Sequence, residues 1–186
     1  MIKLNEKHPF FFIHNWLKSV PSPVTLTFSQ YGYREPGNSP SRKVITISSK
    51  ELSLGWITAQ IDSLPSDTEL AFHSKVTLNN RVFQIPMIDF STKLELDILN
   101  IRLEIVRKQL NLDPVIYDSG HSFHGYFGCY IPQKSWQKFL GNLLLCNHYA
   151  DPIVDSRWIG YSLRHGFSAL RWSQNTEHYL GLPIQV

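Results

Sequence analysis

Apolar residues recur at helical spacing in two segments of the second half of the chain. The first set has a period of three to four residues and consists of Leu96, Leu99, Leu103, Val106 and Leu110. This spacing predicts an amphipathic helix, preceded by the capping-box pattern of Thr92 and Glu95 and ended by Pro114. The second set consists of Trp136, Phe139, Leu140, Leu143 and Leu144. It predicts a second helix, which Pro132 can begin.

Shorter apolar segments around these helices predict strands. The predicted strands span residues 24–31, 43–48, 69–77, 82–90, 115–117, 123–131 and 167–172. Asn79 and Asn80 provide a turn between two of them, and Ile153 with Val154 returns the chain to the sheet. Two shorter helices are predicted over residues 12–19 and 157–164, the second ending near Gly166.

From residue 82 onward, the predicted order is strand, helix, strand, strand, helix, strand. This is the RRM-like split βαβ arrangement, which builds an antiparallel sheet with helices on one face. We therefore expect an α+β protein whose core spans residues 69–173. Residues 1–68 are expected to form an extension with a β-hairpin and residues 174–186 a tail, all within a single domain.

Composition narrows the class of protein. The chain has 186 residues, of which 42% are hydrophobic, 13% aromatic and 18% charged, which describes a folded protein of one domain. A formal net charge of +3 permits nucleic-acid binding without requiring it. Two cysteines exclude a disulfide framework and a four-cysteine zinc site. With no signal peptide pattern and no apolar run of about 20 residues, we expect a soluble cytoplasmic protein without a membrane partner.

A long loop is predicted between the first two strands, over residues 32–41. Aromatic and basic residues lie in it and beside it, namely Tyr31, Tyr33, Arg34, Arg42 and Lys43. Such residues could stack on bases and contact phosphates. A solvated hairpin tip is the simpler interpretation.

Three polar groups occur where the predicted topology would bring them onto one face of the sheet. Asp89 ends the first core strand, residues 119–124 lie in the following hairpin, and Asp155 precedes the last helix. Carboxylates at strand ends are oxygen ligands suited to Mg²⁺ or Mn²⁺. Alternatively, Asp89 could serve only as a negative charge at a helix N-terminus.

The hairpin segment Ser-Gly-His-Ser-Phe-His offers several hydrogen-bond donors to an anion, among them Ser119, His121 and His124. Surface histidines on a turn are the alternative, and no third ligand completes a zinc site nearby. Arg157, Arg164 and Arg171 follow Asp155. Arginine matches phosphate geometry, although each of these could instead form a structural ion pair or lie on a solvated helix face.

In this order, the motifs resemble those of the archaeo-eukaryotic primase superfamily, the primase-polymerases, over residues 69–173. That superfamily carries Asp-x-Asp, then Ser-Gly-x-x-x-His, then a hydrophobic residue with Asp, and arginines afterwards. Here the motifs are Asp89-Phe90-Ser91, Ser119-Gly120-His121-Ser122-Phe123-His124, Val154-Asp155 and Leu170-Arg171. The second acid of the first motif is replaced by Ser91.

The resemblance implies a metal-dependent nucleotide site. Asp89 and Asp155 match catalytic acids that bind Mg²⁺ or Mn²⁺. The residues expected to bind the nucleoside triphosphate are Ser119, His121, His124, Arg164 and Arg171.

The implied function is a nucleotidyltransferase that uses nucleoside triphosphates and a DNA or RNA template to synthesise or extend primers. A partner protein would supply template or helicase functions. Ser91 favours an alternative, a catalytically impaired primase-fold subunit that binds nucleotides or nucleic acid. A third possibility is an RNA-binding module with exposed aromatic residues on its central strands and no paired acids.

Overall fold

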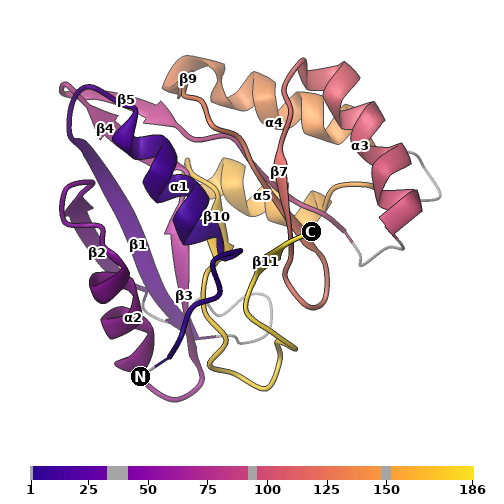
Figure 1. Cartoon of the computed structure of the whole chain (residues 1–186). Coiled ribbons are helices and arrows are strands. Elements are labelled where there is room, and N and C mark those ends of the chain that lie inside the picture. The colour runs from indigo at the N-terminus through magenta and orange to yellow at the C-terminus, as the bar shows by residue number, and fades with distance from the viewer. Residues whose placement is uncertain (1, 33–41, 92–95, 148–151) are drawn as a thin grey trace.

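The computed structural model describes residues 2–32, 42–91, 96–147 and 152–186. The predicted capping box of Thr92 and Glu95 and the loop residues 33–41 lie outside these segments. Within them, the chain forms two antiparallel sheets and five α-helices (Figure 1). None of the described helices has the length and apolar character needed to cross a membrane.

The larger sheet contains the N-terminal hairpin. Its strands are β1 (Val24–Gly32), β2 (Lys43–Ser48), β3 (Thr68–His73), β4 (Lys75–Leu78), β5 (Arg81–Gln84), β9 (Ile131–Pro132) and β10 (Ala169–Arg171). They follow the order β10-β3-β1-β4-β5-β9, with β2 also paired to β1. The predicted hairpin of the first two strands is confirmed. Because β1 also pairs with β3 and β4, however, this hairpin is an integral part of the sheet and not an extension.

The smaller sheet is built mainly from the second half of the chain. Its strands are β6 (Met87–Asp89), β7 (Val115–Asp118), β8 (Phe123–Tyr126) and β11 (Ile184–Gln185). Their order is β11-β7-β8-β6. An antiparallel bridge between Phe90 and Val154 continues the sheet beyond β6.

Four predicted strands differ from the observed ones. Residues 69–77 are divided at Ser74 into β3 and β4 of the larger sheet. Residues 82–90 form two strands in different sheets, β5 and β6, separated by Pro86, which has no N–H to donate to a ladder. Residues 123–131 are likewise divided between β8 and β9. The predicted closing strand, residues 167–172, is the shorter β10 and pairs with β3 in the larger sheet.

The helices are α1 (Pro9–Lys18), α2 (Leu54–Asp62), α3 (Leu96–Leu110), α4 (Trp136–Leu145) and α5 (Ser156–His165). The predictions of α3, α4 and α5 are confirmed. Helix α1 begins earlier than predicted, because His8 Nδ1 accepts a hydrogen bond from Phe10 N at 3.1 Å and caps it. Helix α2 was not predicted, although Ser53 caps it and Ile57 and Ile61 are buried at helical spacing.

Alternate residues of the smaller sheet belong to two different cores. Ile88 and Phe90 pack with α3 and α4, which lie against this sheet in Figure 1. Met87 and Tyr126 belong to the other core, together with buried residues of α1 and the larger sheet. Because successive side chains in a strand point to opposite faces, the smaller sheet has an outer face covered by helices and an inner face. The candidate site lies on the inner face.

Trp172 connects the two sheets and α1. Its indole Nε1 donates a hydrogen bond to Tyr126 Oη at 2.9 Å, and its ring centroid lies 4.7 Å from that of Phe72. Its carbonyl oxygen is bonded to His8 Nε2 at 2.8 Å. This fully buried side chain therefore determines how the smaller sheet sits against the rest of the protein.

We expect Trp172→Ala to lower the free energy of unfolding by about 3–5 kcal/mol, because it leaves a large cavity between the sheets. Urea unfolding monitored by circular dichroism would measure this loss. Leu145→Ala is a matched control, because Leu145 is 72% exposed and its truncation should change stability by less than about 0.5 kcal/mol. Similar stabilities for the two variants would contradict the central role of Trp172.

Candidate functional site

A row of cross-strand neighbours joins the two predicted acids to the histidine-containing hairpin. Asp89 in β6 is opposite His124 in β8, and His124 is opposite Tyr117 in β7. Directly opposed residues point to the same face of a sheet, which here is the inner face. Beyond β6, the backbone N–H of Asp155 donates to the carbonyl oxygen of Asp89 at 2.9 Å. The two predicted acids are therefore neighbours in the structure.

Asp155 is the N-cap of α5. Its Oδ1 accepts hydrogen bonds from the backbone N–H groups of Arg157 at 2.7 Å and Trp158 at 3.2 Å. Asp is a favoured N-cap residue because it satisfies donors that have no partner within the helix. These capping bonds use one of the two carboxylate oxygens of Asp155. They hold the Asp155 carboxylate beside Asp89.

Asp89 is held in an environment that disfavours its negative charge. Burial, followed by the negative charge of Asp155, raises the pKa of Asp89 to about 7. Ser122 Oγ donates to Asp89 Oδ1 at 3.2 Å, which offsets part of this effect. The side chain keeps 22% of its surface exposed, so it is reachable from outside. A cation bound between the two carboxylates would stabilise the charged form of both.

His124 is a neutral, buried imidazole. Burial, followed by the positive charge of Arg171, lowers the pKa of His124 to about 3. Its Nε2 lies 3.9 Å from Asp89 Oδ1, and at neutral pH this contact is not an ion pair. Its Nδ1 is buried without a hydrogen-bond partner among the described residues. Such an atom is unfavourable in a folded protein unless a ligand or water satisfies it.

The Ser-Gly turn is organised by internal hydrogen bonds. Ser119 Oγ donates to the carbonyl oxygen of Ser122 at 2.8 Å, so this hydroxyl is engaged within the turn. Gly120 has a φ of +97°, and a Cβ there would lie 3.2 Å from the backbone nitrogen of Leu180. Glycine is therefore required both by the backbone conformation and by the close approach of the C-terminal segment. His121, at the tip of the turn, is exposed.

Arg171 holds this turn against the C-terminal segment. Its buried guanidinium donates to the carbonyl oxygens of Ser119, Ser173 and Gly181. It also lies 3.9 Å from the ring centroid of Tyr179. Its Nε is buried without a partner among the described residues. Arg171 thus positions the turn and places a positive charge close enough to lower the pKa of both Asp89 and His124.

Arg164 does not join this group. It is exposed in the last turn of α5, whereas Asp155 caps the first. A helix of ten residues is about 15 Å long, so Arg164 lies a helix length away from the acidic pair.

Ser91, where the superfamily has its second acid, has a structural partner. Its Oγ donates to the carbonyl oxygen of Pro152, and its backbone N–H donates to Ile153 O at 3.0 Å. These bonds extend the pairing between the end of β6 and the chain before α5. They hold Asp155 beside Asp89.

Three features of the site were not predicted from the sequence. Ser122 links the turn to Asp89, Tyr117 continues the row beyond His124, and residues 179–181 enclose Arg171. The register of the β7–β8 hairpin could have indicated Tyr117, because a turn at residues 119–122 places it opposite His124. Nothing in the sequence marked the C-terminal segment, whose contacts with the turn and with Arg171 involve largely backbone atoms.

Asp89 and Asp155 could contribute two ligands to a divalent cation. No group of three or more His, Cys, Asp or Glu side chains in the described part of the chain could hold a metal ion. Asp89 and Asp155 nevertheless provide two carboxylates. Mg²⁺ is commonly bound through one or two carboxylates, with water and substrate phosphates as its other ligands. Burial, followed by the charge of Asp155, raises the pKa of Asp89, and a bound cation would favour its charged form.

The fold and the site together define an α+β protein with an acidic pair beside a Ser-Gly-x-x-x-His turn. The model of the family described as archaeo-eukaryotic primase 1D-like matches residues 48–184. The chain belongs to this family, which confirms the resemblance found in its motifs. The match includes every residue of the candidate site and leaves out α1 and β1. No curated protein and no solved structure matches the chain.

We expect the stability difference between Asp89→Asn and the wild type to depend on pH. The folded pKa of Asp89 is about 7 and its ordinary value is 3.8. Between these values the folded state binds more protons than the unfolded state, so Asp89 lowers the free energy of unfolding as the pH rises. Asp89→Asn removes this effect. Its advantage over the wild type should grow from near zero at pH 4 to about 1–4 kcal/mol at pH 8.

Chemical denaturation at several pH values would measure this difference. Other titrating groups, including His124, contribute to both proteins and cancel. Asp67→Asn, at an exposed turn position, serves as the control and should show no such trend. A difference that stays constant with pH would contradict the raised pKa of Asp89.

Proposed function

We propose that the protein is a nucleotidyltransferase of the primase-polymerase type. It would bind a nucleoside triphosphate with Mg²⁺ or Mn²⁺ and synthesise or extend nucleic-acid primers. The observation that carries this proposal is the pairing of Asp89 with Asp155 beside His124, whose buried Nδ1 has no partner among the described residues. Membership of a primase family supports it.

The topology of the smaller sheet supports an RRM-like core. Its order is β7, β8, β6 and then Val154, with α3 between β6 and β7 and α4 between β8 and Val154. This is the strand order of a split βαβ unit whose last strand is reduced to one bridge. We assign residues 153–154 to that last position, in place of the predicted residues 167–172.

The proposed roles follow from the position of each group. Asp89 and Asp155 would hold the divalent ion, which supplies charge neutralisation for phosphoryl transfer when bound. His124 would donate its Nδ1–H to a phosphate oxygen, and the exposed His121 would contact the outer phosphates. Ser119 and Arg171 would position the turn, with Arg171 adding a fixed positive charge. A 3′-oxygen then bonds to the α-phosphorus as the bond to pyrophosphate breaks, and the hydroxyl proton passes to solvent.

We expect His124→Ala to weaken nucleoside triphosphate binding by about 10- to 100-fold, as for loss of a hydrogen bond to a charged group. Isothermal titration calorimetry with Mg²⁺ present would measure the change. His14→Ala is the control, because His14 lies in α1, where it stacks on Phe10, and should leave affinity unchanged. Equal affinities for wild type and His124→Ala would contradict the assignment of His124.

A series of stacked aromatic rings near the C-terminal end of α5 supports binding of a template strand. Tyr161 stacks with His165 at a centroid distance of 6.2 Å, His165 with Phe167 at 5.9 Å, and Phe167 with His73 at 4.2 Å. Tyr161 and His165 are exposed. Unpaired bases stack on such rings with little dependence on sequence.

Two arginines lie near these rings. Arg164 is exposed on α5 beside His165. Burial, followed by the positive charge of Arg42, lowers the pKa of His73 and of His165. Arg42 also lies over the ring of Tyr31, with 5.4 Å between its Cζ and the ring centroid. We propose that these cations contact the phosphates of a single strand of DNA or RNA, in place of the triphosphate role predicted for Arg164.

We expect Arg164→Ala to weaken binding of a single-stranded oligonucleotide and to reduce the slope of log affinity against log salt by about one. Fluorescence anisotropy at several salt concentrations would measure both quantities. Lys108→Ala, which removes an exposed charge from the last turn of α3, is the matched control. If both variants lose affinity equally, binding is diffuse and the strand does not follow this surface.

Ser91 supports a second candidate function, a catalytically impaired subunit that binds nucleotide within a larger assembly. A hydroxyl is a weaker ligand for a divalent ion than a carboxylate, and that of Ser91 is bonded to Pro152 O. A partner protein would then supply catalysis or template handling. A simple RNA-binding module is less well supported, because the aromatic residues on the central strands, such as Tyr126 and Phe123, are buried.

We expect Ser91→Asp to increase primer extension with Mn²⁺ or Mg²⁺, because it restores the second acid of the first motif. Ser91→Ala is the matched control, since it also loses the bond to Pro152 without adding a carboxylate. Extension of a labelled primer would be measured for both variants and the wild type. No activity in any of the three, with folding and triphosphate binding intact, would reject the polymerase proposal and leave the binding subunit.

A further inference from the structure

Helix α1 has two apolar faces, although one is enough to attach it to the core. Phe10, Ile13 and Leu17 are buried in the core beside the larger sheet. Phe12 and Trp16, four residues apart, lie on a different face and are only partly buried. A surface helix normally carries a single apolar stripe. The second face packs in part against the core and is otherwise open to solvent.

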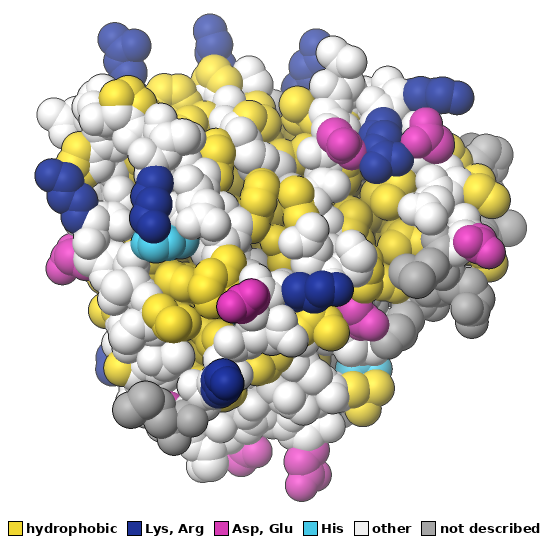
Figure 2. Space-filling model, viewed as in Figure 1, with side chains coloured by type: hydrophobic (Ala, Val, Ile, Leu, Met, Phe, Trp, Pro, Cys, Tyr) yellow, Lys and Arg dark blue, Asp and Glu magenta, His cyan; other side chains and the backbone are white. Residues whose placement is uncertain are grey.

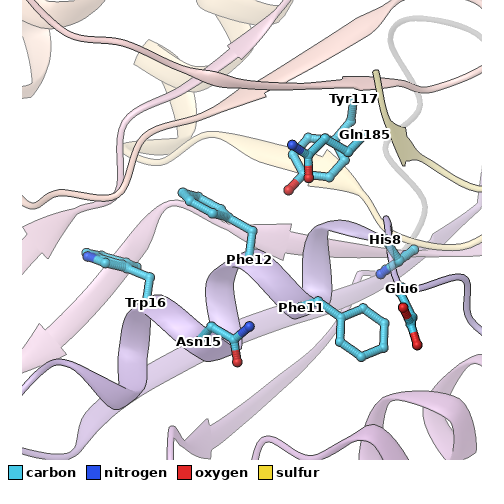
Figure 3. Close-up of a pocket in the computed structure, with 8 residues that line it drawn as sticks. All are labelled: Glu6, His8, Phe11, Phe12, Asn15, Trp16, Tyr117 and Gln185. Carbon is cyan, nitrogen blue, oxygen red and sulfur yellow. The ribbon is translucent and has the colours of Figure 1, made fainter.

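This second face lines a cavity of about 380 Å³ between α1 and the strands β7 and β11. Figure 3 shows Phe12 on the side of α1 that faces Tyr117 of β7 and Gln185 of β11. Hydrophobic side chains gather in the middle of the same face of the molecule in Figure 2, over the region between α1 and β7. The volume lies within the range of about 300–1,000 Å³ that is usual for small-molecule sites.

Packing contacts hold the aromatic walls of the cavity in place without a ligand. Trp16 packs against Tyr130, with ring centroids 4.6 Å apart. A Cβ on Gly128 would lie 3.5 Å from both Phe12 and Trp16, so the rings also pack closely on this backbone. Aromatic walls that are already fixed lose little conformational freedom on binding.

The polar groups of the lining select a neutral ligand. Asn15 and Gln185 each carry an amide that can donate and accept hydrogen bonds. Among the described lining residues, Glu6 is the only one with a carboxylate side chain, and burial lowers the pKa of His8 to about 4. The described lining contains no Lys or Arg, so it offers a phosphate no cationic side chain.

We propose that this cavity is a second ligand site, which binds a nucleobase without its phosphates. Flat aromatic walls suit a planar heterocycle, and amide groups suit the donors and acceptors on its edge. The choice of a nucleobase over other planar heterocycles rests on the proposed function. Residues 6–16, which supply most of the lining, precede the matched residues 48–184. The site is therefore a feature of this chain outside the family match.

The test is a titration of the protein with adenosine, guanosine, cytidine and uridine in the absence of divalent ions. Ligand-observed NMR would measure the binding. At least one nucleoside should bind with a dissociation constant on the order of 0.1–1 mM, as for compact ligands of this size. Phe12→Leu, which keeps an apolar side chain but removes the ring, should weaken binding by about tenfold. Phe12→Trp should retain binding, and Ile101→Ala, on the exposed face of α3, should leave it unchanged.

Two further comparisons separate this site from the proposed triphosphate site. Asp89→Asn and His124→Ala should leave nucleoside affinity unchanged, even though they weaken triphosphate binding. Nucleoside monophosphates should bind the wild type less tightly than nucleosides, and Glu6→Gln should reduce that difference. Competition by a four-nucleotide single strand would identify the base of a strand as the ligand, and its failure to compete would identify a free nucleoside.

The proposal is overturned if no nucleoside binds at 10 mM, or if Phe12→Leu binds as tightly as the wild type. It is also overturned if Asp89→Asn or His124→Ala abolishes nucleoside binding, because the nucleoside would then occupy the triphosphate site. Loss of triphosphate binding alone, with nucleoside binding intact, would count against the proposed function and not against this cavity.

Discussion

The candidate site depends on one short piece of strand pairing, the bridge between Phe90 and Val154. This bridge places the backbone N–H of Asp155 on the carbonyl oxygen of Asp89, so that two carboxylates far apart in sequence become neighbours. Burial, followed by the nearby charge of Asp155, raises the pKa of Asp89 to about 7. Ser91 strengthens the same pairing through Pro152 and Ile153. Without this pairing, Asp155 would be only a helix cap.

Two buried polar atoms near the acidic pair have no partner among the described residues. They are His124 Nδ1 and Arg171 Nε, and each such atom is unfavourable in the absence of a bound group. Arg171 also donates three hydrogen bonds to carbonyl oxygens of the Ser-Gly turn and the C-terminal segment. These bonds hold the turn in place, and the proposed catalysis by positioning and charge depends on such a fixed arrangement.

The three proposed binding surfaces lie in different parts of the molecule. The acidic pair and the Ser-Gly turn form one end of a row of residues on the inner face, and Tyr117 forms the other end, where it also lines the cavity beside α1. The stacked rings near the end of α5 form a third surface, a helix length from Asp155. The proposed nucleotide binding at these surfaces does not require the second acid that Ser91 replaces.

The sequence alone determined the features that depend on neighbouring residues. Apolar spacing predicted α3 and α4, turn chemistry predicted the hairpins, and motif order identified Asp89, Asp155 and the Ser-Gly turn as one group. Only the tertiary structure decided that β10 joins the larger sheet, that Arg171 binds carbonyl oxygens, and that Arg164 lies away from the acids. The spacing of apolar residues along the chain indicates which face of a helix or strand is buried. The choice of partner strand, and the direction of a long arginine side chain, instead depend on contacts between residues distant in sequence.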